Sequence, residues 1–296
     1  MLETFGRTLS EAAGKRPRAK RPDRSAARLK VTATKHRGRV SAATVRANVK
    51  DSAPDLTLAG KIVPPADQVR GVLSDRAVQV KGPGGKGTQV MLSSMPLATA
   101  TAPTAGKPVS YRLADLDWKT AGDRYTISRP VQAVSLPKTA GGVARLGNGV
   151  AFRLADPGSD APGTVSGETV TYPNIATDTD LVTRALPTGV GYAWSLRSPR
   201  SKQELRVGIS VPAGRQLRKD DQGGVSVTGD KDDPATTITP AIAIDADGQR
   251  VPVSTRVEDD AIVYDVDHAE GTVAYPVTLD PLLYSQTFTA GQVADG

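Results

Sequence analysis

The sequence contains no cysteine and few aromatic residues. Its 296 residues include 0 Cys, 2 Trp, 3 Phe and 7 Tyr, and aromatics make up only 4% of the chain. The lack of cysteine excludes disulfide bonds, thiolate metal sites and cysteine nucleophiles, although it does not identify the cell compartment. The core must therefore be built mainly from Val, Ile, Leu and Ala. We expect these aromatics to lie in a core or an interface: Trp118, Tyr172, Tyr192, Trp194, Tyr264 and Tyr275.

Long apolar runs are also missing. No stretch approaches the ~20 residues of a membrane-spanning helix, so we expect no transmembrane segment. The beginning of the chain, MLETFGRTLSEAAGKRPRAKR, has no apolar stretch of the length that a secretory signal needs. The end, TFTAGQVADG, shows neither a helix stop nor a closing strand. Either the protein stays inside the cell, or it leaves by another route, or the chain is one piece of a longer protein, and the end of the chain favours the last of these.

The positive charge is confined to the N-terminal end. Residues 1–50 carry 14 Lys and Arg against 3 Asp and Glu, a net charge of +11, whereas the remaining residues carry 24 against 28. Because this segment has almost no large apolar residues, we expect a disordered basic arm. Helix formation is only weakly indicated around Ser41–Val49. The arm lacks aromatics for base stacking, so contact with nucleic acid would be salt-sensitive and without sequence specificity.

Residues 51–108 show no clear period. Short Val and Leu runs alternate with proline- and glycine-rich stretches such as GPGGKG, and the segment ends in the low-complexity PLATATAPTAGKP. We predict an irregular linker here with two or three edge strands. GPGGKG itself is not a phosphate-binding loop, because Val80 stands where the first glycine is needed and Gly87 follows Lys86 in place of Ser or Thr.

A period of two residues dominates the chain from residue 109 to residue 284. Turn signals such as PTG, PAG, DQGG and DADG separate the alternating runs. Many short strands at this spacing are typical of an antiparallel sandwich or barrel. We therefore predict an all-β fold, an antiparallel β-sandwich-like domain, with residues 285–296 beginning a further segment. The main alternating sets are Val190, Tyr192, Trp194 and Leu196; Leu205, Val207, Ile209 and Val211; Ile262, Tyr264 and Val266; and Val273, Tyr275, Val277 and Leu279.

The stretch TYPNIATDTDLV, residues 171–182, raises the question of a metal site. Asp178 and Asp180 are two residues apart and would share one face of a strand. Ca²⁺ binds six to eight oxygens, and two carboxylates with Asn174 fall short of that number. Aspartates in turns commonly accept hydrogen bonds from nearby backbone N–H groups. We therefore expect an aspartate-rich corner, with Ca²⁺ binding as the alternative.

Asp245 and Asp247 form a second metal candidate, in IDADGQRVPV. The start resembles a calcium loop, but position 12 is Arg256 where such a loop has glutamate. Because apolar alternation flanks the motif on both sides, we predict a hairpin turn. No other cofactor is indicated.

Catalytic groups are scarce. There is no G-x-S-x-G nucleophile motif, and Ser135 and Lys138 are separated by Pro137 in a strand-like context, which does not suit a Ser-x-x-Lys pair. His268 lies in a turn among acidic residues, and we expect it to be a surface residue that titrates. The chain has 31 Asp and Glu residues, so many pairs of carboxylates could serve in sugar hydrolysis. No motif in the sequence marks one of these pairs. We predict no catalytic residue.

Several short motifs in order carry a resemblance to known proteins. They are VSLPKTAGGVARLGNGVAFRL, GETVTYPNIATDTDLVTRALPTGVGYAWSLRSPRSKQELRVGISVPAG, ITPAIAIDADGQRVPV and VAYPVTLDP. From about residue 118 to residue 281 the chain resembles the β-rich region that precedes the repeats in RHS/YD-repeat, wall-associated, DNRLRE-domain and polymorphic-toxin-like exported proteins, common in actinobacteria. YPV-x-hydrophobic-DP closes that region. No catalytic residues are carried over from it.

The resemblance implies a non-catalytic structural or interaction module of a large secreted or cell-surface bacterial protein. Its expected partners are other domains of that protein or cell-surface glycans, with no specific nucleic acid. Three alternatives remain open: a carbohydrate- or cell-wall-binding module, binding of anionic polymers through the basic arm, and a glycoside hydrolase-like enzyme. Glycan binding by the β-domain would support the first alternative, and salt-sensitive binding of polyanions would support the second. The third requires two carboxylates that converge in a cleft.

Overall fold

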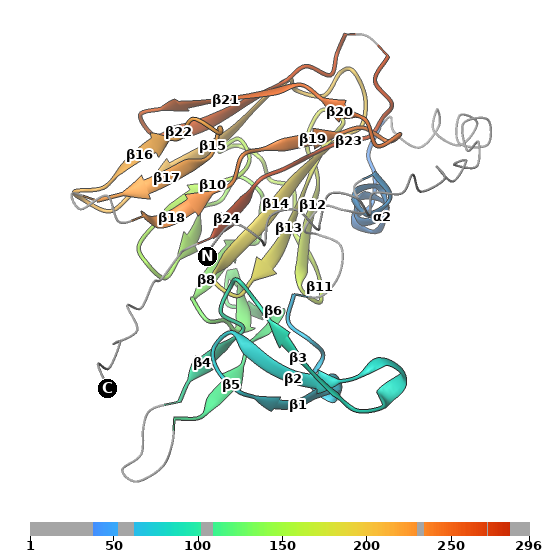
Figure 1. Cartoon of the computed structure of the whole chain (residues 1–296). Coiled ribbons are helices and arrows are strands. Elements are labelled where there is room, and N and C mark those ends of the chain that lie inside the picture. The colour runs from blue at the N-terminus through green and yellow to red at the C-terminus, as the bar shows by residue number, and fades with distance from the viewer. Residues whose placement is uncertain (1–37, 53–61, 102–108, 230–233, 271, 285–296) are drawn as a thin grey trace, which may run out of the picture. The chain divides into compact units, whose positions relative to one another are not determined.

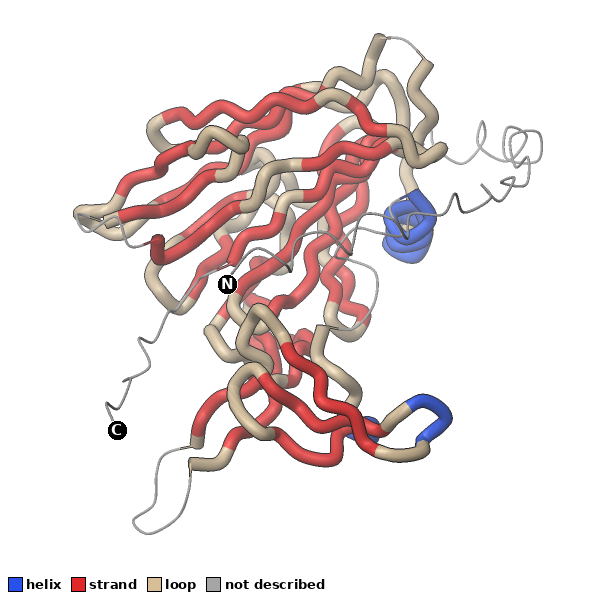
Figure 2. The backbone as a smooth tube through the Cα atoms, viewed as in Figure 1, coloured by secondary structure: helices blue, strands red, loops and turns tan. Residues whose placement is uncertain are grey.

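Antiparallel β-sheet makes up most of the chain that the structure describes (Figures 1 and 2). The computed structural model describes residues 38–52, 62–101, 109–229, 234–270 and 272–284, all within the unit His36–Gly296. Most of the predicted basic arm and the predicted further segment at 285–296 lie outside these residues. The predicted fold class, all-β with antiparallel sheets, is confirmed.

One large sheet has eight strands in the order β21-β22-β15-β10-β9-β8-β7-β6. Consecutive strands are mostly neighbours, as in a meander, and every pairing is antiparallel. The strands are β6 (Asp115–Ala121), β7 (Arg124–Arg129), β8 (Val134–Pro137), β9 (Ala144–Leu146), β10 (Ala151–Arg153), β15 (Glu204–Ser210), β21 (Val253–Glu258) and β22 (Ala261–Val266).

The second large sheet has eleven strands. Its main order is β11-β12-β13-β14-β24-β18-β17-β16, and β23 pairs with β14 and with β19, which in turn pairs with β20. The strands are β11 (Thr164–Ser166), β12 (Thr169–Ala176), β13 (Thr179–Leu186), β14 (Gly189–Leu196), β16 (Gln216–Lys219), β17 (Val225–Thr228), β18 (Pro234–Ile238), β19 (Ile242–Ile244), β20 (Arg250–Val251), β23 (Val277–Asp280) and β24 (Leu282–Tyr284).

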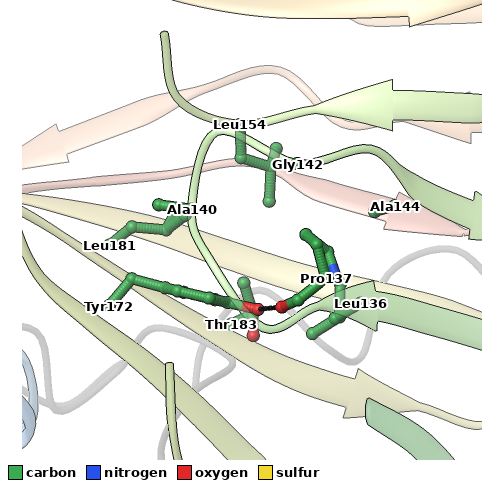
Figure 3. A pocket seen from close by; sticks show the side chains of 9 residues that line it. All are labelled: Leu136, Pro137, Ala140, Gly142, Ala144, Leu154, Tyr172, Leu181 and Thr183. Atoms are coloured by element: carbon green, nitrogen blue, oxygen red, sulfur yellow. Dashed lines mark hydrogen bonds between the residues drawn. The ribbon is translucent and has the colours of Figure 1, made fainter. Parts of the chain in front are cut away.

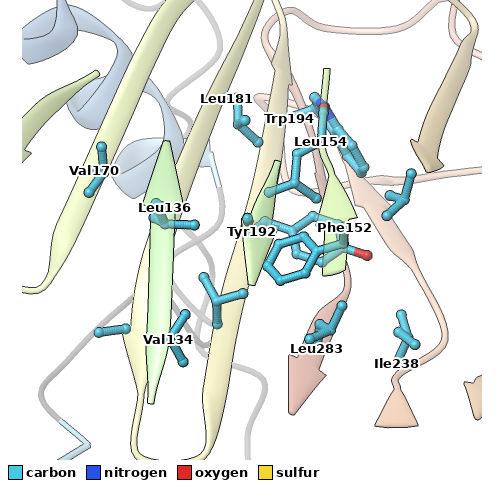
Figure 4. Close-up of a cluster of buried hydrophobic side chains, with 14 of the residues drawn as sticks. Val134, Leu136, Phe152, Leu154, Val170, Leu181, Tyr192, Trp194, Ile238 and Leu283 are labelled. Atoms are coloured by element: carbon cyan, nitrogen blue, oxygen red, sulfur yellow. The ribbon is translucent and has the colours of Figure 1, made fainter. Parts of the chain in front are cut away.

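The hydrophobic core lies between these two sheets (Figure 4). Leu136 and Phe152 come from the eight-stranded sheet and face Leu181, Tyr192 and Trp194 of the eleven-stranded sheet. The Trp194 indole has a backbone partner within this core, since it donates to the carbonyl of Leu154 at 3.1 Å. Two sheets that bury one face each against the other form a β-sandwich.

The aromatic prediction is confirmed at five of its six positions. The buried side chains are Trp118, Tyr172, Tyr192, Trp194 and Tyr264, whereas Tyr275 is half-buried. The alternation Val190, Tyr192, Trp194, Leu196 also predicts β14 and its core face correctly. With so few aromatics available, each one anchors a large share of the core surface.

Smaller sheets occupy the segment 51–108 and its edge. A three-stranded sheet contains β1 (Val69–Val72), β2 (Ala77–Lys81) and β3 (Thr88–Leu92), and β4 (Ala98–Ala100) pairs with β5 (Tyr111–Leu113). Short 3₁₀ helices lie at Ala66–Gln68 and at Pro83–Gly85, the latter inside the predicted GPGGKG loop. The described part of this segment is thus more regular than the sequence indicates.

Helix α2 (Ala42–Ser52) lies largely within the segment 1–50 that the sequence predicts to be a disordered basic arm. It covers the weakly indicated helical stretch Ser41–Val49, so that prediction is confirmed, and the arm cannot extend as an unstructured segment to residue 50. Ser41 precedes the first turn, and its hydroxyl accepts the N–H of Thr44 at 3.2 Å, the usual bond of an N-cap. α2 lies against β12, β13, β14 and β23 (Figure 1).

Candidate functional site

The stretch TYPNIATDTDLV forms a bulged hairpin between β12 and β13. The pairing runs regularly to Tyr172 opposite Leu181 and resumes only at Ala176 opposite Thr179. Asn174 and Asp178 both have positive φ angles, 58° and 45°. Asn and Asp tolerate this left-handed backbone better than other residues with a side chain, which explains their presence here. The hairpin lies in the middle of the domain, since β6 to β10 precede it in the chain.

Arg197 lies at the centre of a buried ionic cluster beside this hairpin. It follows β14 directly and is 1% exposed. Its Nε lies 2.8 Å from Oδ2 of Asp180, and its Nη1 lies 3.8 Å from Oδ1 of Asp178. Asp180 is fully buried and also accepts the backbone N–H of Asn174 at 2.7 Å. The expectation that an aspartate caps the corner therefore holds for Asp180.

Asp178 is bound on its other side by the loop that follows β14. Ser198 Oγ donates to Oδ2 of Asp178 at 2.6 Å, and the Arg200 guanidinium donates to the same oxygen at 2.8 Å. Ser201 Oγ donates to the Asp178 backbone carbonyl at 2.7 Å. Side chains of the sequence RSPRS, residues 197–201, thus contact Asp178 and stabilise its backbone, which has a positive φ.

The two carboxyls have opposite pKa shifts. Burial alone would raise the pKa of Asp178, but the hydrogen bonds from Ser198 and Arg200 outweigh it and hold that pKa below its ordinary value. Burial raises the pKa of Asp180, and the Asn174 N–H and the Arg197 guanidinium offset only part of the effect. The arginine partners also differ: Arg200, which pairs with Asp178, has a side chain that is 61% exposed, whereas the Arg197 side chain, which pairs with Asp180, is 1% exposed.

The cluster binds the main chain of residues 38–40. Arg197 Nη1 donates to the carbonyl of Gly38 at 2.6 Å, and the N–H of Gly38 donates to Oδ1 of Asp178 at 3.3 Å. The Asn174 amide meets both backbone groups of Val40, accepting its N–H at 3.1 Å and donating to its carbonyl at 3.0 Å. We name Asn174, Asp178, Asp180 and Arg197 the main-chain cradle.

Apolar side chains of α2 also pack against the sandwich. Val45 and Val49 of the helix are buried against Val182 of β13 and Ala193 of β14, in a cluster separate from the main core. These strand residues alternate with Leu181 and Tyr192, which face the sandwich core. The outer face of the sheet at β13 and β14 is therefore buried as well, by a segment that lies more than a hundred residues earlier in the sequence.

The geometry of the cradle does not favour a cation. The guanidiniums of Arg197 and Arg200 already lie within 4 Å of the aspartates, and a metal ion at Asp178 or Asp180 would have to displace a positive charge. Across the described ranges, no group of three or more His, Asp or Glu side chains could hold a metal ion. The cradle can bind peptide main-chain groups, which need both donors and acceptors.

Asp245 and Asp247 lie in a hairpin turn, as predicted. β19 and β20 pair antiparallel across it, and Gly248 at its end has a φ of 77°. Asp245 Oδ1 accepts the N–H groups of Asp247 and Gln249 at 3.0 and 2.8 Å, and its Oδ2 accepts the N–H of Ala274 at 3.2 Å. Asp245 thus organises the turn and joins it to the segment before β23.

His268 is buried, and the prediction of a surface histidine is wrong. The residue is 1% exposed, because the ring of Tyr275 packs edge-on against it at a centroid distance of 5.9 Å. Its Nδ1 lies 3.0 Å from the Tyr275 hydroxyl and its Nε2 lies 3.3 Å from the carbonyl of Lys202. Burial lowers the pKa of His268, although Lys202 and Asp267 oppose it. The contacts of His268 thus join the segment before β23 to the loop before β15.

A small cavity lies between the sheets near Tyr172 (Figure 3). Its free volume is about 10 Å³, room for roughly one water molecule and far below the roughly 300–1,000 Å³ of most small-molecule sites. The Tyr172 hydroxyl donates to the carbonyl of Pro137 at 2.6 Å, and Thr183 Oγ1 donates to the carbonyl of Val170 at 3.1 Å. Its polar side chains are thus already paired, and it is a feature of core packing. The lining residues are Leu136, Pro137, Ala140, Gly142, Ala144, Leu154, Tyr172, Leu181 and Thr183.

Sequence reasoning identified Asn174, Asp178 and Asp180 but not their basic partners. Arg197 falls on the non-core side of the β14 alternation, the same side as Asp180 across the ladder, where Asp180 pairs with Ser195. An acid and a base on the same face of adjacent strands are the available signal. Gly38 and Val40 have no comparable signal, since nothing local links them to residues 174–197.

A scan against protein-family models and a search of curated proteins both find no match to the chain. In the part of the chain that the structure describes, no helix has the length and apolar character to cross a membrane.

Proposed function

We propose that the chain is a non-catalytic structural and interaction module of a large secreted or cell-surface bacterial protein. The observation that carries the proposal is the use of the main-chain cradle. The most heavily charged buried cluster described above binds a segment of polypeptide, Gly38–Val40, through its backbone. Buried charges of this kind in an enzyme would instead face a cleft where a substrate could reach them.

The architecture supports the same proposal. A sandwich with two buried faces on β13 and β14 is a rigid support for attached segments, and α2 packs on its outer face. The order of short motifs from residue 118 to residue 281 resembles the pre-repeat β-region of RHS/YD-repeat and polymorphic-toxin-like exported proteins. In such proteins a β-module connects other domains, which are then the expected partners.

The test is the size and location of the native product. Cell, envelope and medium fractions are immunoblotted with an antibody to the β-domain. A band far larger than 30.9 kDa outside the cytoplasm is the expected result. A cytoplasmic band near 31 kDa would refute the proposal. Glycan-array binding and hydrolase assays on the same protein test the carbohydrate-binding and glycosidase alternatives.

Binding to anionic polymers through the arm is a second candidate, which the net charge of +11 in residues 1–50 favours. Counterion release makes such binding fall steeply with salt. Heparin or polyphosphate retention that is lost on deleting residues 1–37, with α2 left in place, would support it. Retention that survives the deletion would place the binding on the sandwich.

A further inference from the structure

We propose that the main-chain cradle and the adjoining face of β13 and β14 form a peptide-binding site that exchanges its resident segment, residues 38–52, for the same segment of a second copy of the chain. The inference deepens the proposed interaction module, on which it rests, by naming the site and the class of ligand. The ligand is an extended main chain that continues into a short amphipathic helix.

The contacts to residues 38–40 are those by which a protein binds any extended peptide. Two backbone N–H groups and two carbonyls of the segment meet side chains of the sandwich, at 2.6 to 3.3 Å. The Asn174 amide presents one donor and one acceptor to Val40, which is the pattern that a neighbouring β-strand would present. Such contacts recognise backbone groups, so they can form whether or not the segment belongs to the same chain as the sandwich.

Two features then restrict the sequence that the site accepts. Gly38 has a φ of 85°, a conformation that glycine adopts at little cost, although a side chain there would meet no neighbour within 4 Å. Val45 and Val49, one helical turn apart, fill the apolar part of the site over Val182 and Ala193. The site therefore favours a segment that has a glycine, a valine two residues later, and then two valines four residues apart.

A second copy satisfies this pattern by identity. It supplies the same glycine and valines, and Arg46, whose Nη1 lies 3.4 Å from Thr171 Oγ1, would make the same contact. Exchange of one element between identical chains is a low-cost route to a dimer, because every contact of the closed form is regained. The opening of the segment exposes no part of the main core, since the cluster under α2 is separate from it.

The experiment uses the full chain and a fluorescein-labelled peptide of residues 38–52, GRVSAATVRANVKDS. In the variant V45D/V49D two buried valines become charged, which displaces the resident helix and empties the site. The matched control A43D/A47D adds the same two charges at the same spacing to exposed positions of the same helix. Fluorescence anisotropy should show the peptide binding V45D/V49D at least roughly tenfold more tightly than A43D/A47D, in which the resident segment competes.

Removal of the Asn174 amide tests whether the cradle is responsible. Adding N174G to V45D/V49D should weaken peptide binding by roughly tenfold or more, because the hydrogen bonds to Val40 are lost. Equal binding with and without N174G would overturn the proposal. Absence of peptide binding to V45D/V49D, with a circular dichroism spectrum and melting temperature like those of the control, would overturn it as well.

One further measurement keeps the proposal testable if V45D/V49D does not fold, and a second applies when that variant folds. Hydrogen exchange of the wild-type chain should show residues 38–49 opening faster than β13 and β14, and equal protection would refute a separable segment. Sedimentation of V45D/V49D mixed with the N174G chain should give a heterodimer, since one copy offers an empty site and the other a released segment. Only monomers would refute the exchange, and the localisation experiment on the proposed function would be unaffected.

Discussion

Arg197 donates a hydrogen bond of 2.6 Å to the carbonyl of Gly38, a residue 159 positions earlier in the chain. The same guanidinium forms a buried ion pair with Asp180 at 2.8 Å and donates to Asn174 at 3.0 Å. One side chain therefore joins the end of β14, the β12–β13 hairpin and the segment that precedes α2.

Substitution R197M should destabilise the protein strongly. The methionine keeps part of the apolar stem but leaves the Asp180 carboxyl buried without its charged partner, which typically costs about 3–5 kcal/mol. The free energy of unfolding from urea denaturation at neutral pH measures the loss. The control R206M changes an exposed arginine on β15 and should leave the unfolding midpoint nearly unchanged. Similar midpoints for the two variants would contradict the role of Arg197.

Two substitutions at Asn174 separate the contacts of its amide from its backbone strain. N174G removes the contacts to Val40 while tolerating the φ of 58°, whereas N174A removes the same contacts and forces a residue with a Cβ into that conformation. Both should speed hydrogen exchange at the Val40 amide. N174A should unfold about 1 kcal/mol more easily than N174G. The reverse order of stability would show that the left-handed backbone is not retained.

Asp280 should make the protein less stable as the pH rises. Its carboxyl is 5% exposed, and burial raises its pKa from an ordinary value of 3.8 to about 7. Because the folded state holds this proton more tightly than the unfolded state, the contribution is fully present below pH 4 and is lost as the pH rises through about 7. D280N should remove this dependence and gain up to roughly 4 kcal/mol at pH 8 relative to the wild type.

The measurement for Asp280 is the difference in unfolding free energy between D280N and the wild type, followed from pH 4 to pH 8 by denaturant titration. The difference should persist at high salt, because a buried group is little screened. A difference that is constant across the pH range would show that the carboxyl titrates alike in the folded and unfolded states.

His268 should make the protein less stable as the pH falls, the opposite of the pH dependence expected for Asp280. Burial lowers its pKa in the folded state, so the neutral ring is favoured there and protonation favours unfolding. The stability that depends on the neutral ring is present above the ordinary value of 6.5 and is lost as the pH falls below it. In H268Q the fall in stability between pH 7 and pH 5 should be smaller than in the wild type. Equal slopes in the two proteins would refute this assignment.

The sequence by itself determined the class of fold and much of the strand pattern. The alternation of Tyr192 and Trp194 with Ala193 and Ser195 identifies both a strand and its core face, because side chains of a strand point alternately to opposite sides. DADG between two alternating runs likewise identifies the turn from β19 to β20. These features depend on neighbours within a few residues, which the sequence displays directly.

Only the tertiary structure decided what covers the outer face of β13 and β14. Alternation predicts that Asp180, Ala193 and Arg197 lie opposite the core, and such a face is ordinarily solvated. The structure instead buries it under residues 38–52, and the same long-range contact turns the aspartate pair into a cradle for main-chain groups. No local period encodes a contact across 159 residues, since it depends on where the two sheets bring the chain in space.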